Sequence, residues 1–165
     1  MADQPFVADG IEILDYGIIC SEGDVRREAA PETDLGYVTR PTGDVSVAAT
    51  TRYVAAEPGL MFGVEAIARH AGLDDATMTV RHPPFPDTGT DEQSWETGFF
   101  TDEPTINYYR FDLPTEMVPG IWTFIAHAND TLLFSVEFRL RGPGLAPGYG
   151  EVCATLAAAV HAEHG

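Results

Sequence analysis

The stretch "VPGIWTFIAHANDTLLFSVEFRL", residues 118–140, constrains the fold most strongly because apolar and polar residues alternate along nearly its whole length. The second half carries an apolar row formed by Leu132, Phe134, Val136, Phe138 and Leu140. A mostly polar row alternates with it: Leu133, Ser135, Glu137 and Arg139. A period of two with one dry and one wet face predicts an antiparallel hairpin packed on a second sheet. Residues 128–131 predict its turn, because Asn and Asp tolerate left-handed backbone.

The first half of this hairpin should place its aromatic residues in the core. Trp122, Phe124 and Ala126 share one face, while Thr123 and His127 lie on the other with Ile121 and Ile125. We therefore expect four structural core residues, Trp122, Phe124, Phe134 and Phe138. A buried Trp usually finds a hydrogen-bond acceptor, so the indole N–H of Trp122 should bond to a loop carbonyl.

Other short runs predict further strands over residues 11–20, 44–56, 60–70, 76–83 and 105–113, with loops over 21–35 and 86–104. About seven strands separated by turn signals predict a mainly β fold, an immunoglobulin-like antiparallel β-sandwich. We expect the sandwich domain to span residues 1–141 and a linker to span 142–150. The Ala-rich segment 151–165 predicts a C-terminal helix that docks on the sandwich or on a second subunit.

The chain is strongly acidic, with 26 Asp and Glu residues against nine basic residues, all of them Arg, and a net charge of −17. This charge repels phosphate backbones and anionic lipid headgroups, so nucleic acid and membranes are not expected as partners. The first ten residues lack the basic and apolar regions of a signal peptide, which predicts a cytoplasmic location. In a reducing cytosol, Cys20 and Cys153 should be free and buried.

One tripeptide, Asp87-Thr88-Gly89, matches the catalytic turn of aspartic proteases. That turn needs an apolar strand running directly into the Asp, whereas here prolines at 83, 84 and 86 precede it and would interrupt any strand. The sequence also lacks a nucleophile elbow and a phosphate-binding loop. No catalytic residue and no cofactor is predicted.

A small-ligand or metal site in the loops around residues 82–91 is the alternative function. His82, Asp87 and Asp91 are the candidate ligands, because an oxygen-rich loop with a Gly can hold calcium. The spacing does not fit an EF-hand. Tyr108 or Arg110 could complete such a site, and its chemistry, binding or catalysis, stays open.

Aromatic residues in the segment 86–104 are the candidates for contact with a partner. Trp95, Phe99 and Phe100 could form an exposed patch of the kind that marks an interface. Alternatively, these side chains fold back and cover one end of the sandwich.

Several segments together resemble one family: "IEILDYGII", "PGLMFGVEAIA", "VRHPPFPDTGT" and "YYRFDLPTEMVPGIWTF" followed by "LLFSVEFRL". The chain is similar over residues 11–140 to bacterial proteins known only as a domain of unknown function. The most specific part is Glu116–Phe124, which resembles the family pattern Glu-x-Val-Pro-Gly-x-Trp-x-Phe. The resemblance implies an immunoglobulin-like sandwich and no activity, cofactor or catalytic residue, and the C-terminal helix lies outside it.

We therefore expect a non-enzymatic domain that binds another protein or forms a homodimer. Sandwiches commonly bind through edge strands or end loops. If the C-terminal helix mediates dimerisation, deletion of residues 142–165 should give a soluble monomer.

Overall fold

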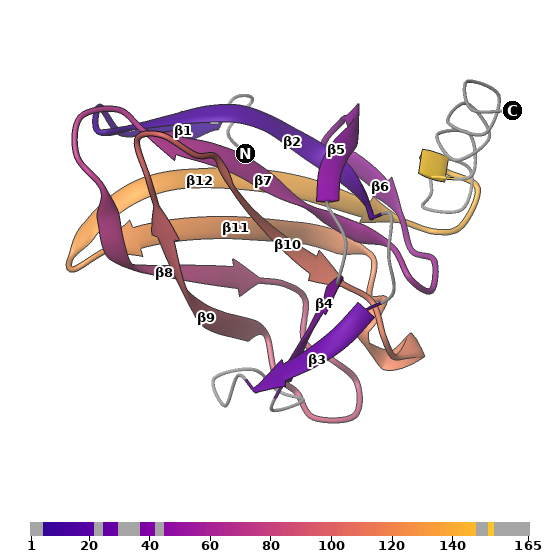
Figure 1. Cartoon of the computed structure of the whole chain (residues 1–165). Helices are drawn as coiled ribbons and strands as arrows, with labels where there is room; N and C mark the ends of the chain where they lie inside the picture. Colours follow the sequence, from indigo (N-terminus) through magenta and orange to yellow (C-terminus); the bar gives the residue numbers. More distant parts are fainter. Residues whose placement is uncertain (1–4, 22–24, 30–36, 42–44, 148–151, 154–165) are drawn as a thin grey trace, which may run out of the picture.

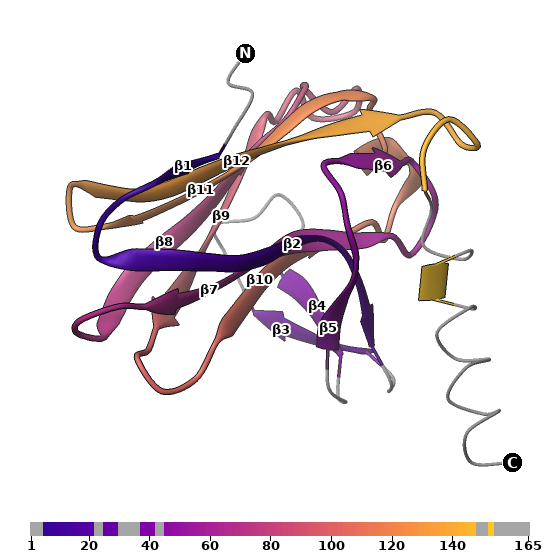
Figure 2. The same ribbon diagram turned by 90° about the horizontal axis from the view of Figure 1, so that it is seen from above.

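The computed structural model describes residues 5–21, 25–29, 37–41, 45–147 and 152–153 of the chain. Two antiparallel sheets pack face to face around one core (Figures 1 and 2). The mainly β, antiparallel sandwich predicted from the alternating pattern is confirmed. The helix predicted over 151–165 lies outside the described residues apart from Val152 and Cys153, so the structure does not support it.

The first sheet contains the hairpin that the sequence predicts. Its path is β1-β12-β11-β8-β9, and β6 pairs in parallel with the end of β12. The strands are β1 (Phe6–Val7), β6 (Tyr53–Ala55), β8 (Leu73–Arg81), β9 (Glu92–Phe99), β11 (Gly120–Ala128) and β12 (Thr131–Arg141).

The second sheet has the order β10-β7-β2-β5. Its strands are β2 (Ile11–Ser21), β5 (Val45–Thr50), β7 (Met61–Ala68) and β10 (Thr105–Arg110). A separate hairpin of β3 (Val25–Ala29) and β4 (Tyr37–Pro41) lies on the side of the second sheet that faces away from the first (Figure 2). A short 3-10 turn, η1 (Pro114–Glu116), leads into β11.

Three predicted boundaries are wrong. The loops expected over 21–35 and 86–104 contain strands β3 and β9, and the single strand expected over 44–56 is two strands, β5 and β6, in different sheets. The chain turns between them at Thr51, whose hydroxyl accepts the N–H of Tyr53 at 3.0 Å. This local hydrogen bond replaces ladder pairing at the point where the chain crosses between sheets.

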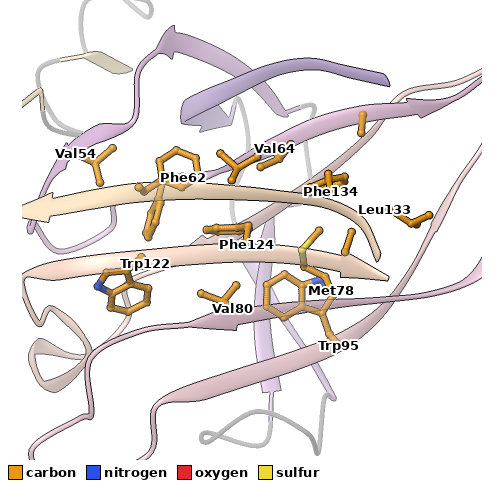
Figure 3. Packing of buried hydrophobic residues seen from close by; sticks show 14 of the residues in the cluster. Val54, Phe62, Val64, Met78, Val80, Trp95, Trp122, Phe124, Leu133 and Phe134 are labelled. Carbon is orange, nitrogen blue, oxygen red and sulfur yellow. The ribbon is translucent and has the colours of Figure 1, made fainter. Parts of the chain in front are cut away.

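Phe62 of β7 lies at the centre of the core and contacts aromatic rings of the opposite sheet (Figure 3). Its ring centroid lies 5.8 Å from Trp122, 5.5 Å from Phe124 and 5.3 Å from Phe138. All four predicted core residues, including Phe134, are fully buried. Burial of each such ring stabilises the fold by about 1.5–3 kcal/mol.

The turn of the closing hairpin forms as predicted, with Asn129 in left-handed backbone at φ 54°. The apolar row of β12 differs at its start. The register passes from Ala126 opposite Phe134 to His127 opposite Leu132, so Leu133 is the extra residue of a bulge. Leu133 is therefore buried and Leu132 is 41% exposed, the reverse of a strict alternation.

Cys20 and Cys153 form a disulfide with their Cα atoms 5.6 Å apart, so the prediction of two free thiols is wrong. The bond joins the end of β2 to a segment 133 residues later, where Val152 packs against the core. Pro147 of the expected linker is also held against the sandwich, because its carbonyl accepts the N–H of Ala55 in β6 at 3.0 Å.

Candidate functional site

His82 is buried in an aromatic stack at the end of β8. Its ring lies between Phe85 and Trp122, with centroid distances of 4.1 and 4.7 Å and interplanar angles of 16° and 25°. Nδ1 lies 2.8 Å from the carbonyl oxygen of Pro83, which can only accept, so Nδ1 carries a proton and donates it. Nε2 then accepts from the side-chain amide of Gln93 at 3.3 Å. Both ring nitrogens are engaged within the protein, which leaves no lone pair for a metal.

The other proposed ligands do not converge on His82. Asp87 and Asp91 are exposed, and their loop is closed by backbone hydrogen bonds from Gly89 to Phe85 and from Phe85 to Thr90. Within the described residues, no three His, Cys, Asp or Glu side chains gather as a metal site would require. The structure therefore provides no ligand set for the metal hypothesis.

The two residues proposed to complete that site lie on the other sheet. Tyr109 points inward, since its ring contacts Trp122 at 5.3 Å. Alternation therefore places its neighbours Tyr108 and Arg110 on the outer face of the second sheet. Arg110 forms an ion pair of 2.5 Å with Asp112. Neither side chain faces His82.

The expected aromatic contact patch does not form. Trp95 is 5% exposed and Phe99 is fully buried, because both lie on the inward face of strand β9. The indole N–H of Trp95 donates to the side-chain oxygen of Asn107 at 2.9 Å and so links the two sheets. Only Phe100, beyond the strand, is substantially exposed, at 44%. The alternative interpretation, that these rings cover part of the sandwich, holds for Trp95 and Phe99.

Glu116 is a buried carboxylate that the sequence analysis did not single out. One oxygen accepts the backbone N–H groups of Leu113 at 2.7 Å and Asp112 at 2.9 Å, and the other accepts the hydroxyl of Tyr109. Burial raises the pKa of Glu116 above its ordinary value, although these hydrogen bonds oppose the rise. The indole N–H of Trp122 donates to the carbonyl of Val118 at 2.9 Å, as the sequence predicts. This cluster holds the segment between β10 and β11 in place.

The outer face of the first sheet is a broad surface on which binding residues can gather. We define it by the residues that point away from the core on six strands: Phe6, Tyr53, Asp74, Asp75, Thr77, Thr79, Arg81, Glu92, Ser94, Glu96, Ile121, Thr123, Ile125, His127, Leu132, Ser135, Glu137, Arg139 and Arg141. The opposite sheet lies behind it, and β3 and β4 lie beyond that sheet (Figure 2). No described element packs over this face.

The outer face of the first sheet differs from the rest of the molecule in charge and polarity. It carries three Arg residues against three Glu and two Asp residues, a net charge of −2, while the whole chain has a net charge of −17. One ion pair, Arg81–Glu92 at 3.3 Å, lies within it. Its centre is a flat band of Thr, Ser and Ile residues. Four of the exposed large apolar residues lie on it, namely Phe6, Tyr53, Ile121 and Leu132, with exposed fractions of 41–50%.

Comparison with known proteins is consistent with this architecture. The model of a family described as a domain of unknown function (DUF3859) matches residues 8–140. This chain belongs to that family. The crystal structure of an immunoglobulin-like protein from Pseudomonas aeruginosa is similar, with a TM-score of 0.55 and 18% identity over 84% of this chain and 97% of that chain. At this identity the similarity shows the fold alone. No curated protein matches the chain.

Membership of this family confirms the resemblance inferred from residues 11–140 and assigns no activity. Glu116 and the outer face of the first sheet are the features that sequence reasoning missed. The alternation of Ile121, Thr123 and Ile125 already placed three apolar or β-branched residues on the wet side of a hairpin.

No part of the described chain contains a helix long and apolar enough to span a bilayer.

Proposed function

We propose that this chain is a protein-binding domain of the β-sandwich class whose binding surface is the outer face of the first sheet. The observation that carries the proposal is the charge of this face: it is nearly neutral, at −2, on a molecule whose net charge is −17. Interface cores are enriched in aromatic and Arg residues relative to the remaining surface. Phe6, Tyr53 and Arg141 supply such residues here.

The geometry of the face also suits a protein partner better than a small molecule. Small ligands bind in concave pockets that bury most of their surface. A sheet of alternating β-branched and Ser residues is instead broad and shallow, and packs well against another extended surface. Thr79 is only 7% exposed and its hydroxyl lies 3.1 Å from that of Ser94, so the middle of the face is already ordered. An ordered surface loses little side-chain entropy on binding.

Photo-crosslinking in the native host tests this function. A benzoylphenylalanine residue in place of Thr123 would lie at the centre of the outer face of the first sheet. The matched control carries the same group in place of Ile67, which is half-buried on the outer face of the second sheet. We expect a protein adduct from position 123 and none from position 67. Absence of an adduct at 123, or equal adducts at both positions, would contradict the proposal.

A further inference from the structure

We infer that the partner of this face is a second copy of the same chain, packed face to face across a two-fold axis. This inference rests on the proposed function, because it names the occupant of the same surface. It places the binding site on the outer face of strands β1, β6, β8, β9, β11 and β12. It does not involve the C-terminal segment, through which self-association was expected from the sequence.

The charges on the face are arranged so that the surface complements itself. Arg139 and Arg141 lie on β12 beside the beginning of β11, where Arg139 pairs with Ile121. Glu96 lies on β9 beside the other end of β11, in the row that contains Thr77 and His127. The basic and acidic corners are therefore diagonal across the sheet. A two-fold axis that exchanges the two corners brings each copy's Arg141 towards the partner's Glu96, and the contact is made twice.

A partner of one charge sign would not match this pattern. A basic surface would meet Arg81, Arg139 and Arg141, and an acidic surface would meet the three Glu residues. A partner that places acidic residues opposite the basic corner and basic residues opposite the acidic corner complements both. A second copy related by a two-fold axis has that arrangement.

The size of the face is sufficient for a stable dimer. Strand β11 has nine residues, and five strands lie side by side in the sheet. Strand spacing and rise give a face of roughly 24 Å by 30 Å, about 700 Å² per copy. Two copies would bury roughly 1,400 Å², within the range of specific protein interfaces.

The apolar contribution to dimer binding comes from exposed residues near the basic corner, which Arg139 and Arg141 form. Ile121 is 41% exposed and Tyr53 is 46% exposed, and Arg139 pairs with both across the sheet. The guanidinium of Arg141 lies 4.9 Å from the centre of the Tyr53 ring, so this aromatic–Arg pair is already positioned. Aromatic and Arg residues of this kind carry a large share of the binding energy at protein interfaces.

Sedimentation equilibrium of the purified full chain tests the inference. We expect the chain to dimerise with a dimer Kd below about 100 µM. The variant Ile121→Asp should raise the dimer Kd at least about tenfold, because it places a buried charge in each half of the contact. Leu14→Asp is the matched control, because Leu14 is 42% exposed but lies on the second sheet. The dimer Kd of this variant should match that of the wild type.

A charge swap tests the orientation of the two copies and uses only exposed positions. Arg141→Glu should weaken the dimer, as should Glu96→Arg, and the double variant should restore a Kd within about threefold of the wild type. Near-ultraviolet circular dichroism establishes that each variant keeps the native core. Single variants that weaken the dimer without rescue by the double variant would overturn the diagonal pairing.

The outcomes separate this inference from the proposed function. A purified chain that stays monomeric, or a dimer that Ile121→Asp leaves intact, would overturn self-association through this face. If position 123 still crosslinks to a different protein in the host, the protein-binding function holds and only the second copy is excluded. A dimer that Ile121→Asp dissociates and Leu14→Asp preserves supports both.

Discussion

Glu116 shows how a single residue of the family motif stabilises the region around the core. Its carboxylate fixes the backbone at Asp112 and Leu113 and binds the hydroxyl of Tyr109, whose ring packs against Trp122. The Trp122 indole in turn bonds to Val118. The pattern Glu-x-Val-Pro-Gly-x-Trp therefore describes a clamp between β10 and β11. A buried carboxyl group in such a clamp makes stability depend on pH.

We predict that the stability of the wild type relative to Glu116→Gln falls as pH rises. Desolvation raises the pKa of Glu116 in the folded state above its ordinary value of 4.5. A raised pKa in the folded state stabilises the fold fully below 4.5, and this contribution is lost as pH rises through the folded pKa. The free energies of unfolding should be measured by urea titration between about pH 4 and about pH 8.

The exposed Glu103 provides the control, since Glu103→Gln should track the wild type at every pH. A constant difference between the wild type and Glu116→Gln across the titration would show that the carboxyl group has the same pKa in both states. It would then contribute only through its hydrogen bonds.

Gly120 gives a second prediction at the scale of one residue. Its φ is +140°, and a Cβ atom there would lie 2.8 Å from the side chain of Pro83. Gly120→Ala should lower the free energy of unfolding by about 2–3 kcal/mol, from backbone strain and displacement of Pro83. Gly89 has φ +75° with open space around it, so Gly89→Ala should cost only about 1 kcal/mol. Equal losses in thermal or urea unfolding would contradict the role of Pro83.

The disulfide is the connection between elements whose removal has the clearest expected effect. Cys153→Ser should lower the free energy of unfolding by about 2–5 kcal/mol, because the bond closes a loop of more than a hundred residues. Urea unfolding in oxidising and in reducing buffer measures this difference, and the wild type should match Cys153→Ser once reduced. An oxidised wild type no more stable than the variant would contradict it.

The elements that the sequence predicts well are those with an uninterrupted period of two. Strands β2, β7, β11 and β12 have continuous alternation or long apolar runs, and each was expected close to its observed bounds. Strand β9 was missed because its inward row of Gln93, Trp95, Thr97 and Phe99 contains two polar residues, Gln93 and Thr97. Sheet membership is decided by long-range packing, so the division of 44–56 into β5 and β6 has no local signal.

The candidate sites were predicted less well than the elements, for a physical reason. A His beside several Asp residues has the composition of a metal site, but burial between two aromatic rings orients His82 towards Pro83 and Gln93 instead. The disulfide likewise joins residues separated by 133 positions, which spacing alone cannot indicate. The low net charge on the outer face of the first sheet can be recognised only when the order of β8, β9, β11 and β12 in the sheet is known.

At the scale of the whole molecule, the net charge of −17 opposes self-association even though the contact face is nearly neutral. Two such molecules repel each other over the Debye length, about 30 Å at 0.01 M salt and about 10 Å at 0.1 M. The Arg–Glu contacts at the rim of the proposed dimer act only at short range. Each contributes at most about 1 kcal/mol, because both partners are exposed.

We therefore predict that salt strengthens the dimer. Raising sodium chloride from about 10 mM to about 300 mM screens the repulsion between the two acidic bodies more than it weakens the rim contacts, so the dimer Kd should fall about tenfold. Sedimentation equilibrium across this range measures the change in Kd. The control variant Leu14→Asp should show the same dependence of Kd on salt concentration. A Kd that rises with salt would mean that the rim Arg–Glu pairs outweigh the repulsion of the acidic remainder, since screening raises the Kd only where it weakens attraction more than repulsion.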